Sequence, residues 1–225
     1  MKLTATLARI RLNPHAREVQ RDLRDAAQMH KTLMRLVADN LGDSPRHQSG
    51  LLYRLDETPD TSTLLVQATT PLHSHRLPAG YGHVDIKDLR PMFTALRTGL
   101  TVRYRVAVNA AKRERLPLDR KDQRGKIIPL TGPDADQWWM RRATEAGLQL
   151  HTVLPTPLPA SRRYGEHSSL VRHTLIRYDG TATITNPDTL TTALLEGIGR
   201  AKSYGAGLLS LAPATATATA TATAR

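Results

Sequence analysis

His30 is the side chain in this sequence best suited to acid–base chemistry, because an imidazole gains or loses a proton near neutral pH. Its setting depends on where the surrounding helix begins. A helix starting at Val19 places His30 on an apolar stripe, where a lone histidine is usually a core residue. A helix starting at Ala26, after a capping pattern formed by Asp25 and Gln28, moves it to the edge of the stripe, within reach of solvent or substrate. The residues leave both positions open.

A second candidate for chemistry is the glycine-rich stretch 197–207. Glycine lets a backbone approach a phosphate closely and present its amides as an anion-binding nest, and Arg200 and Lys202 add positive charge beside it. The stretch follows a predicted helix and precedes a predicted strand, which is the reverse of the order in a P-loop or dinucleotide-binding turn. Phosphate binding and simple packing of the last strand are equally open. The glycines concerned are Gly197, Gly199, Gly205 and Gly207.

The overall charge points to a polyanionic partner. The chain has 225 residues, and 32 Lys plus Arg against 20 Asp plus Glu give a net charge of +12. Aromatic residues make up only 4% of the chain, too few for a protein that reads single strands by stacking, so we expect contacts to the backbone of an RNA duplex or hairpin. Basic residues expected to make these contacts include Lys112 and Arg113, in a run that extends to Lys126, and Arg162 and Arg163.

Other features exclude several classes of site. The sequence contains no cysteine, so disulfides and thiolate chemistry are absent, which fits a cytoplasmic protein. No apolar run is long enough to span a membrane, and we expect no membrane partner. His73, His75 and His83 lack carboxylates at metal-ligand spacing, so no metal is expected. Trp138-Trp139 is interpreted as one core and one partly exposed tryptophan.

The elements that must position these residues form two similar halves. Residues 101–211 alternate as strand, helix, strand, strand, helix, strand, the order of a ferredoxin-like (RRM-like) fold, and the first half opens in the same way. We therefore predict an α+β protein of two tandem ferredoxin-like domains with antiparallel sheets. The predicted boundaries are 1–90 for the domain with His30, 91–98 for a linker, 99–213 for the second domain, and 214–225 for a low-complexity Ala-Thr tail.

Some segments are predicted to lie outside the sheets. Residues 71–97 are rich in Pro, Gly and His and are predicted to form a loop, a short helix and a linker. The prolines at 155, 157 and 159 predict an irregular connection. Asp179-Gly180 is expected to separate two stretches, 170–178 and 181–185, by a turn or bulge.

With these residues placed, the chain resembles the CasE family, the endoribonucleases that process CRISPR RNA in type I-E systems and belong to the RAMP superfamily. The resemblance covers nearly all of residues 1–213. It rests on the N-terminal Leu-Ala-Arg-Ile-Arg-Leu-Asn-Pro, on Met29-His30-Lys31-Thr32-Leu33 with the preceding Arg21-Asp22-Leu23, on Asn109-Ala-Ala-Lys112-Arg113, and on the glycine-rich segment from Gly197 to Pro213.

The resemblance implies two ferredoxin-like domains and a single cut at the base of a repeat hairpin, made without metal or other cofactor. It also implies that the enzyme keeps its product within the Cascade complex, so the expected partners are the repeat RNA and other Cascade subunits. His30 matches the family's catalytic histidine. A 2′-hydroxyl would attack the adjacent phosphate and an imidazolium would protonate the leaving 5′ oxygen, giving a 2′,3′-cyclic phosphate.

One departure from the family pattern affects catalysis. Family members often have Pro-Tyr where this chain has Ala26 and Ala27, so the assisting tyrosine is missing. Lys31 or Arg35 is expected to assist instead. The alternatives are a catalytically weak or inactive subunit that only anchors the hairpin, and a general basic module that binds unrelated duplexes equally well.

Overall fold

The structure is a computed structural model that describes residues 4–115, 117, 125–162 and 172–214, without the side chains of residues 161, 162 and 172. The first half forms a four-stranded antiparallel sheet in the order β2-β3-β1-β4. Its strands are β1 (Thr6–Leu12), β2 (Leu52–Glu57), β3 (Ser62–Ala68) and β4 (Gly82–Asp88). Its helices are α1 (Arg17–Arg24), α2 (Ala26–Met34), α3 (Pro45–Ser49) and the 3₁₀ helix η1 (Ser74–Arg76).

The second half forms a larger antiparallel sheet in the order β11-β5-β10-β8, with β9 also paired to β10. Its strands are β5 (Thr101–Val108), β8 (Leu148–Leu150), β9 (Leu154–Arg162), β10 (Arg172–Ile184) and β11 (Ser210–Pro213). The other elements are α4 (Arg90–Ala95), the pair β6 (Ala111–Arg113) and β7 (Ile127–Pro129), α5 (Gly132–Glu145), α6 (Pro187–Glu196) and the 3₁₀ helix η3 (Lys202–Tyr204).

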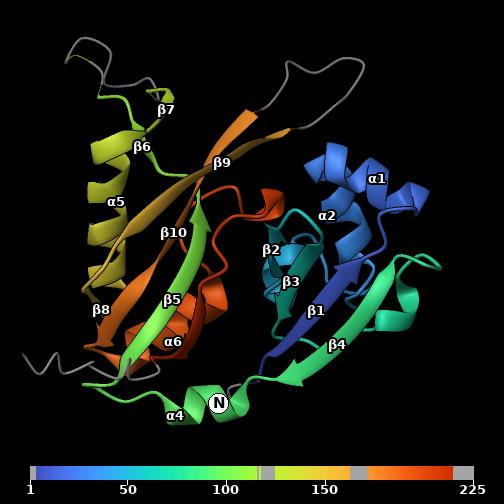
Figure 1. Ribbon diagram of the computed structural model, residues 1–225, viewed down its shortest axis with the longest axis horizontal. Helices are drawn as coiled ribbons and strands as arrows, with labels where there is room; N and C mark the ends of the chain where they lie inside the picture. Colours follow the sequence, from blue (N-terminus) through green and yellow to red (C-terminus); the bar gives the residue numbers. More distant parts are fainter. Residues whose placement is uncertain (1–3, 116, 118–124, 163–171, 215–225) are drawn as a thin grey trace, which may run out of the picture.

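Figure 1 shows the two sheets side by side, with α5 and α6 on the second half and α1 and α2 on the first. Both halves contain antiparallel sheets with helices, and the second contains the predicted order with β6, β7 and β9 added, so the predicted fold class is confirmed. The first sheet runs over residues 6–88 and the second over 101–213, with α4 between them. Phe93 of α4 is buried against the second core, although the predicted linker includes it. The domain boundaries themselves remain a prediction.

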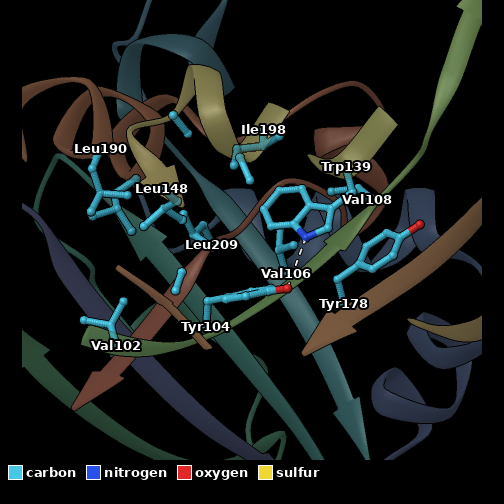
Figure 2. Close-up of a cluster of buried hydrophobic side chains, with 14 of the residues drawn as sticks. Val102, Tyr104, Val106, Val108, Trp139, Leu148, Tyr178, Leu190, Ile198 and Leu209 are labelled. Carbon is cyan, nitrogen blue, oxygen red and sulfur yellow. Dashed lines mark hydrogen bonds between the residues drawn. The ribbon is translucent and has the colours of Figure 1, made fainter. Parts of the chain in front are cut away.

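Aromatic residues organise the core of the second half. The Trp139 indole donates from Nε1 to the Tyr104 hydroxyl (3.3 Å) and stacks on Tyr178 with ring centroids 5.8 Å apart, as Figure 2 shows. Trp138 is also buried, so the expectation of one partly exposed tryptophan was wrong. Both indoles of this dipeptide are covered because α5 presents one to the sheet and the other to the segment around Gly199.

Two segments predicted to be irregular are strands. Residues 82–88 form β4, which pairs with β1, and the run with prolines at 155, 157 and 159 forms β9. Within the described chain, β9 pairs only with β10, so it is an edge strand. Alternate residues of a strand direct their backbone nitrogens to the same side, so prolines two apart can all face away from the partner strand without losing a ladder hydrogen bond.

Asp179-Gly180 is not a break, because β10 runs through it without a turn. A Cβ atom at Gly180 would overlap the carbonyl oxygen of Thr152, so the glycine is required by close approach of another backbone. The beginning of the 170–178 stretch and the Ala-Thr tail beyond Ala214 lie outside the described residues.

A buried guanidinium joins the two halves. Arg54 of β2 is 2% exposed, and its Nη1 donates to the carbonyl oxygens of Arg105 and Leu208 (3.2 Å each) and to Ser210 Oγ (2.9 Å). Asp56 accepts from its Nε and Nη2 at 2.9 and 3.0 Å. The charge of the Arg54 guanidinium is therefore neutralised by a carboxylate of the first half, and its remaining N–H groups donate to acceptors of the second half. These hydrogen bonds fix β2 against β5 and β11.

Replacing Arg54 by alanine should lower the free energy of unfolding by about 3–5 kcal/mol, because Asp56 keeps only the more distant Arg105 (3.8 Å) as a counter-ion among the described residues and several buried acceptors lose their donor. Urea denaturation would measure this change. Arg9→Ala is the matched control, since the Arg9–Asp85 pair (2.9 Å) is on the surface and should be worth less than about 1 kcal/mol. Equal losses in the two variants would contradict the role given to Arg54.

Candidate functional site

His30 lies in α2, which begins at Ala26, so the second of the two predicted helix starts is confirmed. Asp25 interrupts the helical path after α1 and caps α2, accepting hydrogen bonds from the backbone N–H groups of Ala27 (2.8 Å) and Gln28 (3.4 Å). The cap separates α1 from α2 and thereby rotates His30 to the half-buried edge of the apolar stripe.

The imidazole of His30 is not fully partnered. Its Nδ1 is buried and has no hydrogen-bond partner among the residues that the structure describes. Burial of the ring, and secondarily the charge of Arg46, lower the pKa of His30 below its ordinary value, so the imidazole is mainly neutral at neutral pH and able to accept a proton. An unpartnered buried nitrogen is uncommon and is expected where another molecule completes the site.

The glycine-rich segment runs beside this helix. Its 3₁₀ helix η3 packs against both α2 and β2. The buried hydroxyl of Tyr53 in β2 lies 3.0 Å from the carbonyl oxygen of Ser203 and 3.4 Å from that of Ala26. One side chain therefore ties η3 to the first turn of α2 and brings the two motifs of the sequence together.

Packing explains the glycines of this segment. A Cβ atom at Gly197 would lie 2.7 Å from the Leu52 side chain, and one at Gly205 would lie 3.3 Å from the Tyr53 ring. The segment can follow its path against the first half only without side chains there. Gly199 and Gly207 also have positive φ and short contacts at the position of a Cβ atom. Contact of these backbone amides with RNA phosphate remains a prediction.

Backbone strain occurs immediately before Lys202. Ala201 has φ 58° and is the one non-glycine residue with positive φ in the described part of the chain. Its carbonyl oxygen accepts from the N–H groups of Tyr204 (2.8 Å) and Ala206 (3.3 Å), which hold this conformation. The Lys202 ammonium donates to the carbonyl oxygen of Glu196 (2.7 Å), so its position is fixed by the backbone.

The structure brings only some of the basic residues predicted to assist catalysis or bind RNA close to His30. Lys31 and Arg35 are exposed on and just after α2. Lys112 and Arg113 are exposed in β6. Figure 1 shows β6 near the upper end of α5, in the other half of the molecule from α2. Arg200 is exposed beside η3. These cations are compatible with an extended contact surface rather than one compact site.

Two predicted arginines cannot be placed. Arg162 ends β9, but its side chain is outside the described part, and Arg163 lies outside the described residues altogether. The middle of the basic run after Arg115, including Arg120, Lys121 and Arg124, lies outside them as well.

No group of three or more metal-ligating side chains occurs among the described residues. In that same part of the chain, no helix is long and apolar enough to cross a membrane. An open cavity of about 590 Å³ lies between the halves, and its lining includes Arg24, Met29, Leu158 and Tyr204 but not His30. The cavity is adjacent to the candidate site without containing its titratable group.

Sequence reasoning missed Arg46, Tyr53 and the ring contact of His173 with Tyr204 (centroids 4.5 Å apart). Burial, and secondarily the charge of Arg200, lower the pKa of His173. These residues come from separate elements and share no sequence motif. Only the packing of the halves brings them near the two motifs that the sequence does contain.

Comparisons with known proteins agree on one family. The sequence profile of the family described as CRISPR associated protein matches residues 7–213. The chain is 29% identical to the CRISPR-associated endoribonuclease Cse3 of Thermus thermophilus over 92% of this chain and 99% of that protein. It is 26% identical to the CRISPR system Cascade subunit CasE of Escherichia coli over 84% of this chain and 93% of that protein. A structure of the Thermus protein bound to an RNA representing a pre-cleavage complex matches with a TM-score of 0.77 and 29% identity, covering 93% and 100% of the two chains.

Replacing Ala201 by glycine should raise the free energy of unfolding by about 0.5–1 kcal/mol, because glycine removes the left-handed strain while gaining some freedom in the unfolded chain. Ala193→Gly within α6 is the control and should lower stability by a similar amount. Thermal or urea unfolding of the three proteins measures both changes. Destabilisation by Ala201→Gly would show that this conformation carries no strain.

Proposed function

This chain belongs to the family of CRISPR-associated proteins, and we propose that it binds a CRISPR repeat RNA hairpin and cuts the precursor RNA once, at the base of the stem. The family match spans both sheets. One relative is the Thermus endoribonuclease Cse3, and a matched structure shows Cse3 bound to RNA. Because one matched relative is a Cascade subunit, we propose that this protein retains its product within such an assembly in the cytoplasm. The observation that carries the catalytic proposal is His30, half-buried with an unpartnered ring nitrogen next to the basic glycine-rich segment.

The reaction proposed is a metal-independent transesterification. Neutral His30 accepts the proton of the 2′-hydroxyl as its oxygen attacks the adjacent phosphorus. The bond from phosphorus to the 5′ oxygen breaks, and the imidazolium can return its proton to that oxygen. The products are a 2′,3′-cyclic phosphate and a 5′-hydroxyl, so atoms and charges balance. Because its pKa is lowered, His30 first acts as a base towards the 2′-hydroxyl. It then acts as the proton donor that the sequence analysis expected.

Binding is proposed to rely on phosphate contacts. Lys112 and Arg113 of β6 follow shortly after Asn109, whose backbone bridges to Arg200, and Lys202 lies in η3, which packs against α2. Cations spread along such a path suit an elongated duplex. Arg162 and Arg163 are proposed as further contacts at the β9 end. Such contacts give affinity that falls steeply with salt.

The tyrosine expected from the family pattern is missing, so fewer side chains are available to assist His30 in catalysis. Ala27 is in the first turn of α2 and offers no hydroxyl, and the hydroxyl of Tyr53 is engaged with backbone carbonyls. Lys31 and Arg35 remain proposed assistants. This feature favours the second candidate function, a hairpin-binding subunit with weak or no activity, which predicts tight binding without product.

Replacing His30 by alanine should slow cleavage at least about 10²-fold and leave hairpin binding within a few-fold, because only the proton transfer is lost. The measurement is single-turnover cleavage of the host repeat RNA in EDTA, beside a substrate with a 2′-deoxy group at the scissile position, which should remain uncut. His151→Ala is the control, since this exposed residue is in another part of the fold. Normal cleavage by the His30 variant, or dependence on metal, would refute the mechanism.

The pH dependence follows from the lowered pKa of His30. The base form predominates above that pKa, so the rate at subsaturating RNA should rise with pH and level off with a midpoint below 6.5, the ordinary value for histidine. Single-turnover rates between pH 4.5 and 8 at constant ionic strength measure the midpoint. A rate that falls as pH rises through this range would instead make His30 a proton donor only.

A further inference from the structure

Two cationic side chains beside the candidate site are held by backbone carbonyl groups and not by salt bridges to carboxylates. Arg46 of α3 donates from Nη1 to the carbonyl oxygen of Leu51 (3.2 Å), and Lys202 of η3 donates from Nζ to that of Glu196 (2.7 Å). Neither forms an ion pair within the described part of the chain, although both are half-buried. A charge withdrawn from water without a counter-ion costs free energy, so both side chains stand to gain from a bound anion.

Backbone packing brings these cations together although they come from different halves. Leu51, which accepts from Arg46, directly precedes Leu52 in the chain. Glu196, which accepts from Lys202, directly precedes Gly197. The Leu52 side chain lies 2.7 Å from the position of a Cβ atom on Gly197, so the two acceptor segments touch. Since η3 also packs against α2, both cations lie on the side of the fold that carries His30.

Electrostatics supports the same placement. Burial, followed by the charge of Arg46, lowers the pKa of both His30 and Lys202, and the carboxylate of Glu196 opposes this only in part at Lys202. The guanidinium of Arg46 therefore acts on one group from each half. Its own pKa is lowered by burial, which agrees with an arginine partly removed from water.

We propose that Arg46 and Lys202 form, beside His30, a binding site for a single phosphodiester group, and that this group is the scissile phosphate of the RNA. The inference rests on the proposed function and adds Arg46 as a residue that touches the reacting group. The fork of guanidinium donors suits two phosphate oxygens, and the ammonium supplies a point charge. Both would stabilise the negative charge that builds on phosphorus while His30 handles the proton.

The other charged groups around α2 are committed elsewhere. Asp22 of α1 accepts from Arg21 and from the Tyr81 hydroxyl, and Asp25 caps α2. These carboxylates therefore hold the helices rather than compensate Arg46. The remaining described charged or titratable side chains on the elements packed against α2 are Arg17, Glu18 and Arg24 of α1, Tyr53, Arg54, Asp56 and Glu57 of β2, and Tyr204 of η3. Glu196, at the end of α6, is the carboxylate that acts on Lys202.

The test compares Arg46→Gln and Arg46→Lys with wild type in single-turnover cleavage across pH. Arg76→Gln is the matched control, because Arg76 likewise donates to a backbone carbonyl, that of Val37 (3.0 Å), but is paired with Asp39 (3.1 Å). Arg46→Gln should slow cleavage about 10²-fold and raise the midpoint of the pH profile towards 6.5, since a positive charge beside His30 is removed. Arg46→Lys should recover part of the rate, and the control should match wild type.

Unchanged rate and midpoint in Arg46→Gln would overturn the inference while leaving the proposed function intact. So would a loss of rate with lowered stability and an unchanged midpoint, because that is a purely structural effect. If wild type itself does not cut, the proposed function fails, and the site is tested by NMR titration of His30 with inorganic phosphate. Phosphate should then raise the pKa of His30 in wild type but not in Arg46→Gln, and equal behaviour of the two proteins would overturn the site.

Discussion

The arrangement of this molecule depends on the buried guanidinium of Arg54. It is neutralised by Asp56 on its own strand, yet its remaining donors reach backbone carbonyls of β5 and of the segment before β11. A buried donor without an acceptor would cost more than the contact contributes, so the two sheets are held in one relative position. The neighbouring Tyr53 then meets η3, and Gln67 of β3 reaches the carbonyl oxygen of Leu194 at the end of α6 (2.7 Å). The proximity of α2 and η3 follows from this set of contacts.

That proximity creates an unusual electrostatic setting. His30, Arg46 and Lys202 are all half-buried, and each has a pKa lowered mainly by burial. Arg46 and Lys202 therefore carry charges that are partly removed from water without a salt bridge among the described residues, although Glu196 offsets part of this effect at Lys202. A phosphate group supplies the missing negative charge, which couples binding of a polyanion to the chemistry of the imidazole. Burial and the charge of Arg46 keep His30 mainly neutral at neutral pH, the form that accepts the proton of the 2′-hydroxyl in the proposed reaction.

Ala27 stands where the resemblance to the family predicts a tyrosine, so the first turn of α2 offers no hydroxyl at that position. Tyr53 is near the start of α2, but its hydroxyl links Ala26 to Ser203 and so has a structural role. Tyr204 instead packs against the ring of His173 and lines the cavity between the halves. Under the proposal made for Arg46 and Lys202, these two cations assist by charge stabilisation in place of a hydroxyl from α2.

The sequence by itself determined the local features of this protein. The capping pattern of Asp25 offered the start of α2 that the structure has, the order of strands and helices indicated the ferredoxin-like fold, and the motif around His30 with the glycine-rich segment indicated the family. These signals depend on residues a few positions apart. The sequence did not reveal β4 or the proline-bearing β9, because an edge strand is decided by the partner that accepts its hydrogen bonds. Nor could it reveal the contacts of Arg54 with Leu208 or the placement of Arg46 beside Lys202, since each joins residues about 150 positions apart. Only the tertiary structure decided these, because burial and pairing are properties of the packed chain and not of any one segment.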